Sequence, residues 1–259
     1  MYDLIDSLSL YYPHYMLVFI RIATILTVMP VFGYATVSGR VRILLAAALT
    51  LVVAPVVVSG QLPVYGAFLE LAVAAAREVF IGLIIGFGTR LLFEAFAFAG
   101  AFVGMQLGIA IMNVFDPTTE QQSPILSNFW MMVMMLFFLA TNSHHFLVET
   151  VCQNFAVVPP GGGTFSPQLG QTIVHGAGLM YEVALRFAAP ALVFLMLMEF
   201  CFGFMARVMP QMNIFFVSLP LKIGVGLVVI ILSLKLFQSI FGYLFGEMET
   251  LVAAILQNM

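Results

Sequence analysis

Long apolar segments constrain this chain more than any other feature. Apolar residues dominate six stretches, at residues 8–32, 41–58, 68–111, 129–158, 173–209 and 214–256. A helix that crosses a bilayer needs about 20 mostly apolar residues. In lipid, the backbone N–H and C=O groups must also bond within their own segment, which a helix achieves. The sequence therefore predicts an all-α membrane protein with long hydrophobic helices.

Composition agrees with this prediction. Of the 259 residues, 63% are hydrophobic and 8% are charged, whereas soluble domains carry about 25% charged residues. The net charge is −3 and no basic run is present, so nothing favours nucleic-acid binding. No soluble domain or fixed-period repeat interrupts the chain, and we expect one membrane domain over residues 1–259. Pro190 and Pro220 are the expected kink points of the last two segments, because proline removes a backbone donor.

Charged residues lie inside the apolar segments and not only at their ends. They are Arg21, Arg77, Glu78, Arg90, Glu94, Glu182, Arg186, Glu199, Lys222 and Lys235. One such charge at a bilayer centre costs roughly 3 kcal/mol. A charged residue near a helix end can extend its side chain so that the charged group stays in water. This alternative does not account for all ten of these charged residues. The pattern favours a subunit of a larger assembly, whose surface partly faces protein or a water-filled path.

Two charge pairs have the spacing of one helical turn. Arg90 and Glu94 are four residues apart, as are Glu182 and Arg186, and side chains at this spacing meet on one helix face. We expect both pairs to lie in protein–protein interfaces.

Glycines repeat at the same four-residue spacing. The sets are Gly82 and Gly86; Gly100, Gly104 and Gly108; and Gly242 and Gly246. Small residues at this spacing let helix backbones approach closely in membranes. Gly82, Gly86, Gly100 and Gly104 are therefore expected to serve helix packing and assembly, together with the two charge pairs.

The sequence contains no recognisable catalytic or metal motif. HExxH, GxSxG and a phosphate-binding loop with lysine are all absent. Ser143, His144 and His145 lie together, but neighbouring residues of a helix point to different faces, and no acidic residue or cysteine at ligand spacing supports zinc. We expect no enzyme activity, no metal and no cofactor.

One polar stretch between two apolar segments carries a family signature. It reads "ARVMPQMNIFFVSLPLKI" over residues 206–223, and the matching residues are Arg207, Pro210, Gln211, Asn213, Pro220 and Lys222. Further stretches match in order, including "RIATILTVMPVFG" at 21–33, "REVFIGLIIGF" at 77–87 and "NSHHFLVETVCQNFAVVPPG" at 142–161. The chain resembles the FliR family of flagellar export-gate proteins, whose injectisome relatives are called SctT. Ser143 and Glu199 depart from the usual pattern of the family.

The resemblance implies a non-enzymatic subunit of the type III (flagellar) protein export gate. Such proteins combine a FliP-like part with a FliQ-like hairpin, and they form a hetero-oligomeric helical assembly with FliP-like and FliQ-like subunits. The implied location is the bacterial inner (cytoplasmic) membrane at the flagellar basal body. The implied partners are also FlhB-like and FlhA-like export proteins, unfolded secreted protein substrates and membrane lipid.

The resemblance also implies a pore plug that begins within the third apolar segment. Its residues are Gln106, Leu107, Gly108, Ile109, Ala110, Ile111, Met112, Asn113, Val114 and Phe115. Glycine, asparagine and an aspartate before proline weaken helix continuation here, and the apolar residues between them could seal against neighbours. The alternative is an ordinary turn between helices.

A second function remains open on the residues alone. A small-molecule secondary transporter or channel would also carry intramembrane charges and broken helices. A transporter should bind its substrate as an isolated chain, whereas an export subunit should be inert until it is assembled. We see no inverted repeat in the sequence, which disfavours a transporter.

Overall fold

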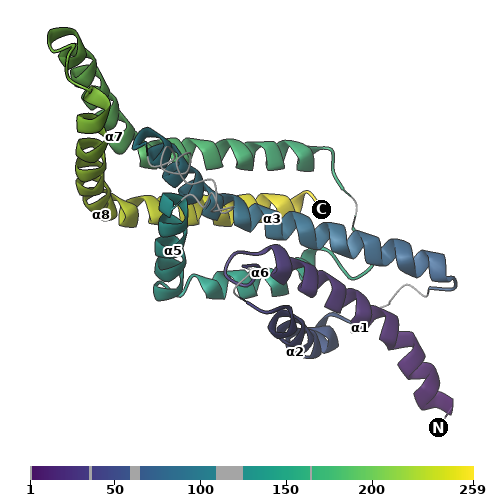
Figure 1. Ribbon diagram of the computed structural model, residues 1–259. Helices are drawn as coiled ribbons and strands as arrows, with labels where there is room; N and C mark the ends of the chain where they lie inside the picture. The colour runs from purple at the N-terminus through teal and green to yellow at the C-terminus, as the bar shows by residue number, and fades with distance from the viewer. Residues whose placement is uncertain (1, 35–36, 59–64, 109–124, 164) are drawn as a thin grey trace. The chain divides into compact units, whose positions relative to one another are not determined.

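The computed structural model describes residues 2–34, 37–58, 65–108, 125–163 and 165–259. In these ranges every regular element is a helix (Figure 1). The helices are α1 (Tyr2–Val28), α2 (Gly39–Val57), α3 (Phe68–Gln106), α5 (Ile125–Ala140), α6 (His144–Val157), α7 (Gln168–Val208) and α8 (Ile214–Gln257). The all-helical prediction is confirmed for the described residues.

Several helices are long and apolar enough to cross a membrane. In the described ranges these are Gly39–Val57, Gln168–Val208, Ile214–Lys235 and Phe237–Gln257, and α5 with α6 makes a fifth if the bent pair is one span. Helices α7 and α8 each continue through their internal proline, Pro190 and Pro220. The membrane-protein prediction is therefore confirmed.

The apolar segment at 129–158 forms two helices and not one. Helices α5 and α6 meet at an angle of 75°, and Asn142 between them has a φ of 57°. This left-handed backbone conformation interrupts a right-handed helix, and asparagine adopts it more readily than most residues do. The polar residues at this point therefore mark a sharp change in direction.

The chain packs into two compact units. Unit 1 comprises Met1–Leu91, Phe138–Gly176 and Met248–Met259, and unit 2 comprises Leu92–Phe137 and Ala177–Glu247. That residues 1–259 behave as one membrane domain stays a prediction.

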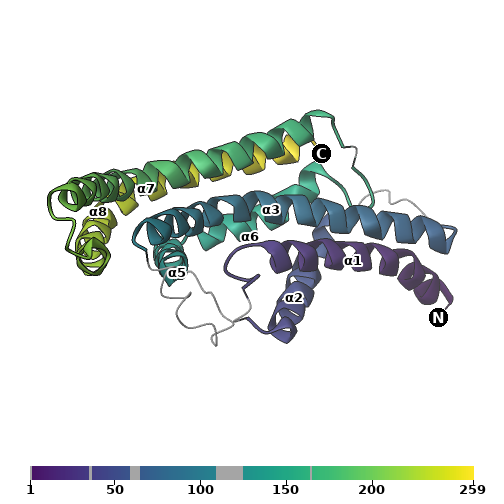
Figure 2. The same cartoon turned by 45° about the horizontal axis from the view of Figure 1, so that its top comes forward.

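Unit 1 is built around α1 and the first part of α3, which lie side by side in two views (Figures 1 and 2). Its fully buried side chains include Ile22 and Ile25 of α1 and Ile81 and Ile85 of α3. These residues recur at helical spacing on one face of each helix, as expected for a face that is buried within the unit.

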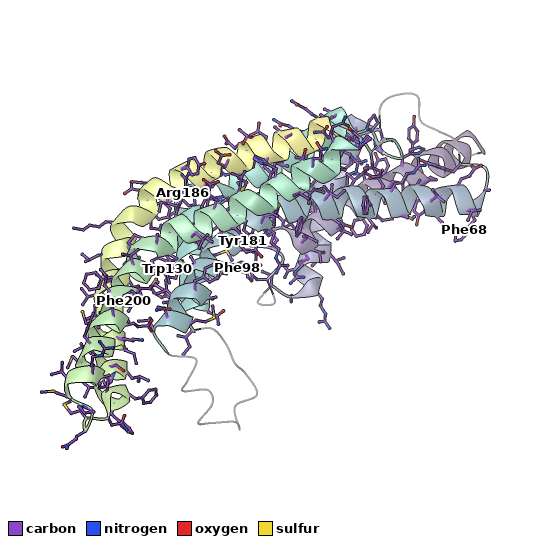
Figure 3. The ribbon with its side chains drawn as sticks, turned by 90° about the horizontal axis from the view of Figure 1, so that it is seen from above. Phe68, Phe98, Trp130, Tyr181, Arg186 and Phe200 are labelled. Atoms are coloured by element: carbon purple, nitrogen blue, oxygen red, sulfur yellow. The ribbon has the colours of Figure 1, made fainter. Side chains whose placement is uncertain are left out.

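Unit 2 has an aromatic core. The ring of Trp130 lies 4.6 Å from the ring of Phe187 in a T-shaped arrangement, and Phe96 lies 5.0 Å from Phe187 and 4.8 Å from Phe237. Aromatic pairs of this kind add about 0.5–1.5 kcal/mol each beyond the area they bury. The cluster therefore joins α3, α5, α7 and α8 within the unit. Phe98 of α3 and Tyr181 of α7 form a second contact between these two helices, with ring centroids 5.3 Å apart. Figure 3 labels Trp130, Phe98 and Tyr181.

Candidate functional site

Glycines let α1 and α3 approach closely in unit 1. A Cβ atom at Gly82 would lie 2.8 Å from the Cβ of Thr24, and one at Gly86 would lie 2.7 Å from the Cβ of Val28. Real Cβ contacts are not that short, so a side chain at either position must displace α1. The residue one turn before Gly82 is Glu78, which continues the same ridge of α3.

Glu78 forms a buried ion pair with Arg21 of α1. Both side chains are fully buried, and the Nε of Arg21 donates to one carboxylate oxygen of Glu78 while its Nη2 donates to the other at 3.0 Å. Arg21 Nη1 also donates to Asn154 Oδ1 at 2.9 Å and to the carbonyl oxygen of Val158 at 2.7 Å. The Gly161 N–H donates to Glu78 Oε1 at 2.7 Å. The guanidinium and the carboxylate thus have protein partners on several sides.

This buried ion pair ties together α1, α3, α6 and the turn that follows α6. Two charges can be buried only when good geometry and further hydrogen bonds offset the loss of water, and both conditions hold here. The guanidinium also lies 4.5 Å from the ring centroid of Phe155, a distance that favours a cation–π interaction.

Sequence reasoning found both charges but did not pair them. Arg21 and Glu78 are 57 residues apart, and no local spacing relates them. The available signal was that Glu78 begins the ridge that continues through Gly82 and Gly86, a spacing that favours a helix contact on this face of α3.

Charged residues of α7 are exposed in unit 2. Glu182 and Arg186 form the ion pair that their spacing predicted, yet their side chains are 48% and 62% exposed. They lie within the apolar helix Gln168–Val208. Of the other predicted pair, Arg90 is exposed and Glu94 is half-buried. That these pairs lie in protein interfaces stays a prediction.

A second charged group of unit 2 joins three helices. We call it the Glu199 cluster, and it consists of Gln106, Glu199 and Lys222. Lys222 Nζ forms an ion pair with Glu199 Oε1, and Gln106 Nε2 donates to Glu199 Oε2 at 2.9 Å. The side chain of Lys222 is 16% exposed and that of Glu199 is 49% exposed. Glu199, the residue that departs from the family pattern, therefore connects the end of α3 to both α7 and α8.

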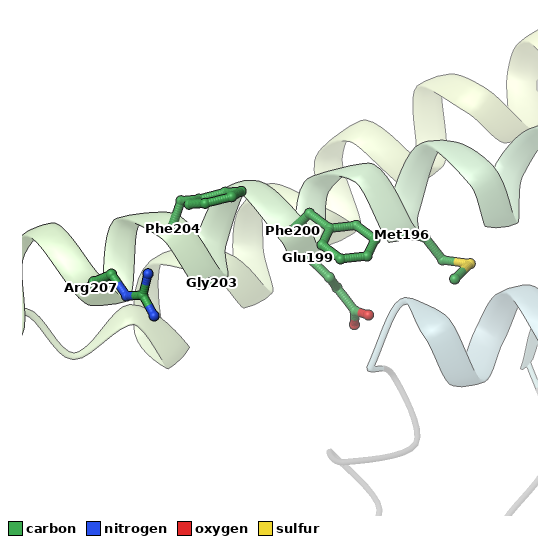
Figure 4. A pocket seen from close by; sticks show the side chains of 6 residues that line it. All are labelled: Met196, Glu199, Phe200, Gly203, Phe204 and Arg207. Atoms are coloured by element: carbon green, nitrogen blue, oxygen red, sulfur yellow. The ribbon is translucent and has the colours of Figure 1, made fainter.

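An open groove runs along α7 beside the Glu199 cluster (Figure 4). The groove holds about 460 Å³ and is lined by Met196, Glu199, Phe200, Gly203, Phe204 and Arg207. Its lining combines apolar side chains with one acid and one base. The part of the chain that the structure describes contains no group of three or more His, Cys, Asp or Glu side chains that could hold a metal.

The family motif spans the end of α7, the turn that follows it and the beginning of α8. Arg207, Pro210, Gln211, Asn213 and Pro220 are exposed, and Lys222 is half-buried. The motif therefore presents polar side chains on the surface of this chain, with Lys222 directed into the Glu199 cluster.

Of the predicted plug residues, the structure describes Gln106, Leu107 and Gly108. Residues 109–115 lie outside the described ranges. Helix α3 ends at Gln106, and Gly108 has a φ of 76°, the left-handed conformation that commonly terminates a helix at glycine.

The remaining predicted packing glycines differ in their surroundings. A Cβ at Gly100 would lie 2.7 Å from Ser127 Cα of α5, whereas one at Gly104 would meet only Leu126 Cβ at an ordinary 3.7 Å. Gly242 and Gly246 have nothing within 4 Å of such an atom. Among the residues that the structure describes, close backbone approach therefore occurs at Gly100 and not at Gly104, Gly242 or Gly246.

The helices and their charges define an integral membrane protein. Residues 12–248 match the family described as "Bacterial export proteins, family 1". Flagellar biosynthetic protein FliR of Bacillus subtilis (strain 168) is 28% identical over 94% of this chain and 96% of its own length. FliR of Escherichia coli (strain K12) is 27% identical over 93% of this chain and 91% of its own length.

The chain belongs to this family of bacterial export proteins, the FliR family. It is accordingly a component of an export apparatus and not an enzyme.

Proposed function

We propose that the chain is a subunit of the type III flagellar export gate in the bacterial inner membrane, at the flagellar basal body. Together with FliP-like and FliQ-like subunits it forms the channel through which unfolded export substrates leave the cytoplasm. FlhB-like and FlhA-like export proteins are its further partners.

The observation that carries this proposal is the exposed ion pair of Glu182 and Arg186 on an apolar helix. Both side chains are about half exposed or more in the single chain, and the helix is long and apolar enough to cross a membrane. Contact with lipid would cost roughly 3 kcal/mol for each charge near the bilayer centre. Protein or water must therefore cover this surface, as it would in a hetero-oligomeric gate.

Purification of the assembled complex tests the proposal. A tagged chain is extracted in mild detergent, and its co-purifying proteins are identified by mass spectrometry. We expect FliP-like and FliQ-like subunits in the purified complex. A tagged membrane protein of similar hydropathy serves as the control. Recovery of the chain alone, with specific binding of a small solute, would instead indicate a secondary transporter.

We also propose that Gln106–Phe115 forms a plug that closes the channel before a substrate arrives. Support comes from the sequence, where apolar residues alternate with residues that weaken a helix, and from the abrupt end of α3 at Gln106. An apolar segment can seal against neighbouring side chains and still yield to a passing polypeptide.

Deletion of residues 109–113 tests the plug. Complex assembly and the leakage of a small solute across the inner membrane are measured together. Deletion of residues 118–122 removes an equally long, polar part of the same connection and is the matched control. Intact assembly with raised leakage is expected only for the first deletion. Intact assembly without leakage would show that the segment is an ordinary connection.

A further inference from the structure

We infer that the last turn of α3 is a fixed anchor from which the plug begins, and that Gly226 and Glu199 are its positioning residues. This inference rests on the proposed plug for its functional meaning. The contacts that define the anchor, however, involve only described residues of unit 2.

The first contact is apolar. Leu107 follows the final residue of α3 and is 1% exposed, although it lies at the point where the helix ends. A Cβ atom at Gly226 of α8 would overlap Leu107 Cδ2 and would lie 3.3 Å from its Cγ. A side chain at Gly226 would have to displace the leucine side chain from its present position, so Gly226 forms a socket for Leu107.

The second contact is polar and involves the neighbouring residue. Gln106 donates to Glu199 at 2.9 Å, and Lys222 forms an ion pair with the other oxygen of the same carboxylate. Glu199 is thereby held between α8 and the end of α3. A charge-assisted hydrogen bond of this type is stronger than one between neutral groups.

The two contacts act at a place where a helix would otherwise fray. Leu107 N donates to Val103 O at 2.9 Å, and Gly108 N donates to Met105 O at 3.1 Å. Terminal hydrogen bonds of this kind open easily unless tertiary contacts hold them. The Leu107 socket and the Glu199 cluster supply those contacts on adjacent residues, so the base of the plug stays fixed.

Substitution of two glycines on α8 separates the anchor from general effects on the helix. Gly226→Val fills the socket, whereas Gly224→Val adds the same side chain where nothing lies within 4 Å. Hydrogen exchange of residues 103–108 is measured by mass spectrometry on the detergent-extracted complex. We expect at least tenfold faster exchange for Gly226→Val and no change for Gly224→Val.

Two further variants decide the case if Gly226→Val does not assemble. Leu107→Ala empties the socket without adding volume and is expected to accelerate exchange as well. The double variant Leu107→Ala/Gly226→Val places the added side chain in the vacated space, so it should exchange more slowly than either single variant. Unchanged exchange in assembled Gly226→Val or Leu107→Ala complexes would overturn the anchor.

Solute leakage across the inner membrane, measured on the same variants, distinguishes the anchor from the plug. Faster exchange with raised leakage supports both proposals. Faster exchange without leakage supports the anchor and counts against the plug. Leakage without faster exchange overturns the anchor, because the end of α3 would then have stayed in place.

Discussion

The two ion pairs Arg21–Glu78 and Glu182–Arg186 both lie on apolar helices but differ in their exposure. The first pair is fully buried in unit 1 and has hydrogen-bond partners from α6 and the turn after it. The second pair is about half exposed on α7 of unit 2. Groups of the chain itself form hydrogen bonds to the first pair in place of water. The exposed atoms of the second pair require water or another chain for their hydrogen bonds. The difference separates charges whose partners all lie within this chain from charges that also face outward from it.

The largest effect on the free energy of unfolding is expected for Arg21→Met. The substitution leaves the Glu78 carboxylate buried without its counter-charge, which typically costs about 3–5 kcal/mol. Thermal unfolding of the purified complex in detergent measures the loss. The double variant Arg21→Met/Glu78→Gln removes both charges and should recover part of the stability. Equal destabilisation by the single and double variants would mean that the charges themselves contribute little.

An intermediate effect is expected for Gly100→Ala. The added Cβ would lie 2.7 Å from Ser127 Cα and 2.8 Å from the Leu126 carbonyl oxygen, so backbone atoms of α5 must move. Overpacking of this kind costs about 1–3 kcal/mol. Gly242→Ala is the matched control, because nothing lies within 4 Å of its added atom and alanine favours a helix by up to about 1 kcal/mol. If both variants unfold at the same temperature, α3 and α5 do not pack as described.

The smallest effect on the chain's own stability is expected for Glu182→Leu and Arg186→Leu. Exposed ion pairs contribute about 0–1 kcal/mol, so the fold of the chain should hardly change. Assembly should respond more strongly, because each single variant leaves one charge without its partner in an interface. The double variant Glu182→Leu/Arg186→Leu should assemble better than either single variant.

Native gel electrophoresis of the extracted complexes measures these assembly yields. Equal yields for all three variants would show that the pair does not lie in a protein interface.

Local features of this protein were predictable because they depend on residues close in sequence. The apolar segments indicated the helices, and the four-residue spacing of Glu182 and Arg186 indicated their ion pair. The ends of the apolar segments do not coincide with the ends of the helices. The segment at 68–111 extends past the end of α3 at Gln106, and the segment at 129–158 is broken at Asn142.

Glycine spacing alone did not distinguish packing positions from open ones. Gly82, Gly86 and Gly100 lie against neighbouring helices, whereas Gly242 has open space around it. The same four-residue pattern occurs in both cases. What differs is whether another helix crosses at that point, and this depends on residues elsewhere in the chain.

The amino-acid sequence by itself determined that this protein is helical and belongs in a membrane, because hydropathy and backbone hydrogen bonding act within each segment. Tertiary structure alone decided which charges far apart in the sequence neutralise each other. Arg21 meets Glu78 across 57 residues, and Lys222 meets Glu199 across 23. A charge in an apolar helix requires a partner, but its position in the sequence does not specify which one. Only the crossing of the helices brings the two charges of a distant pair within bonding distance.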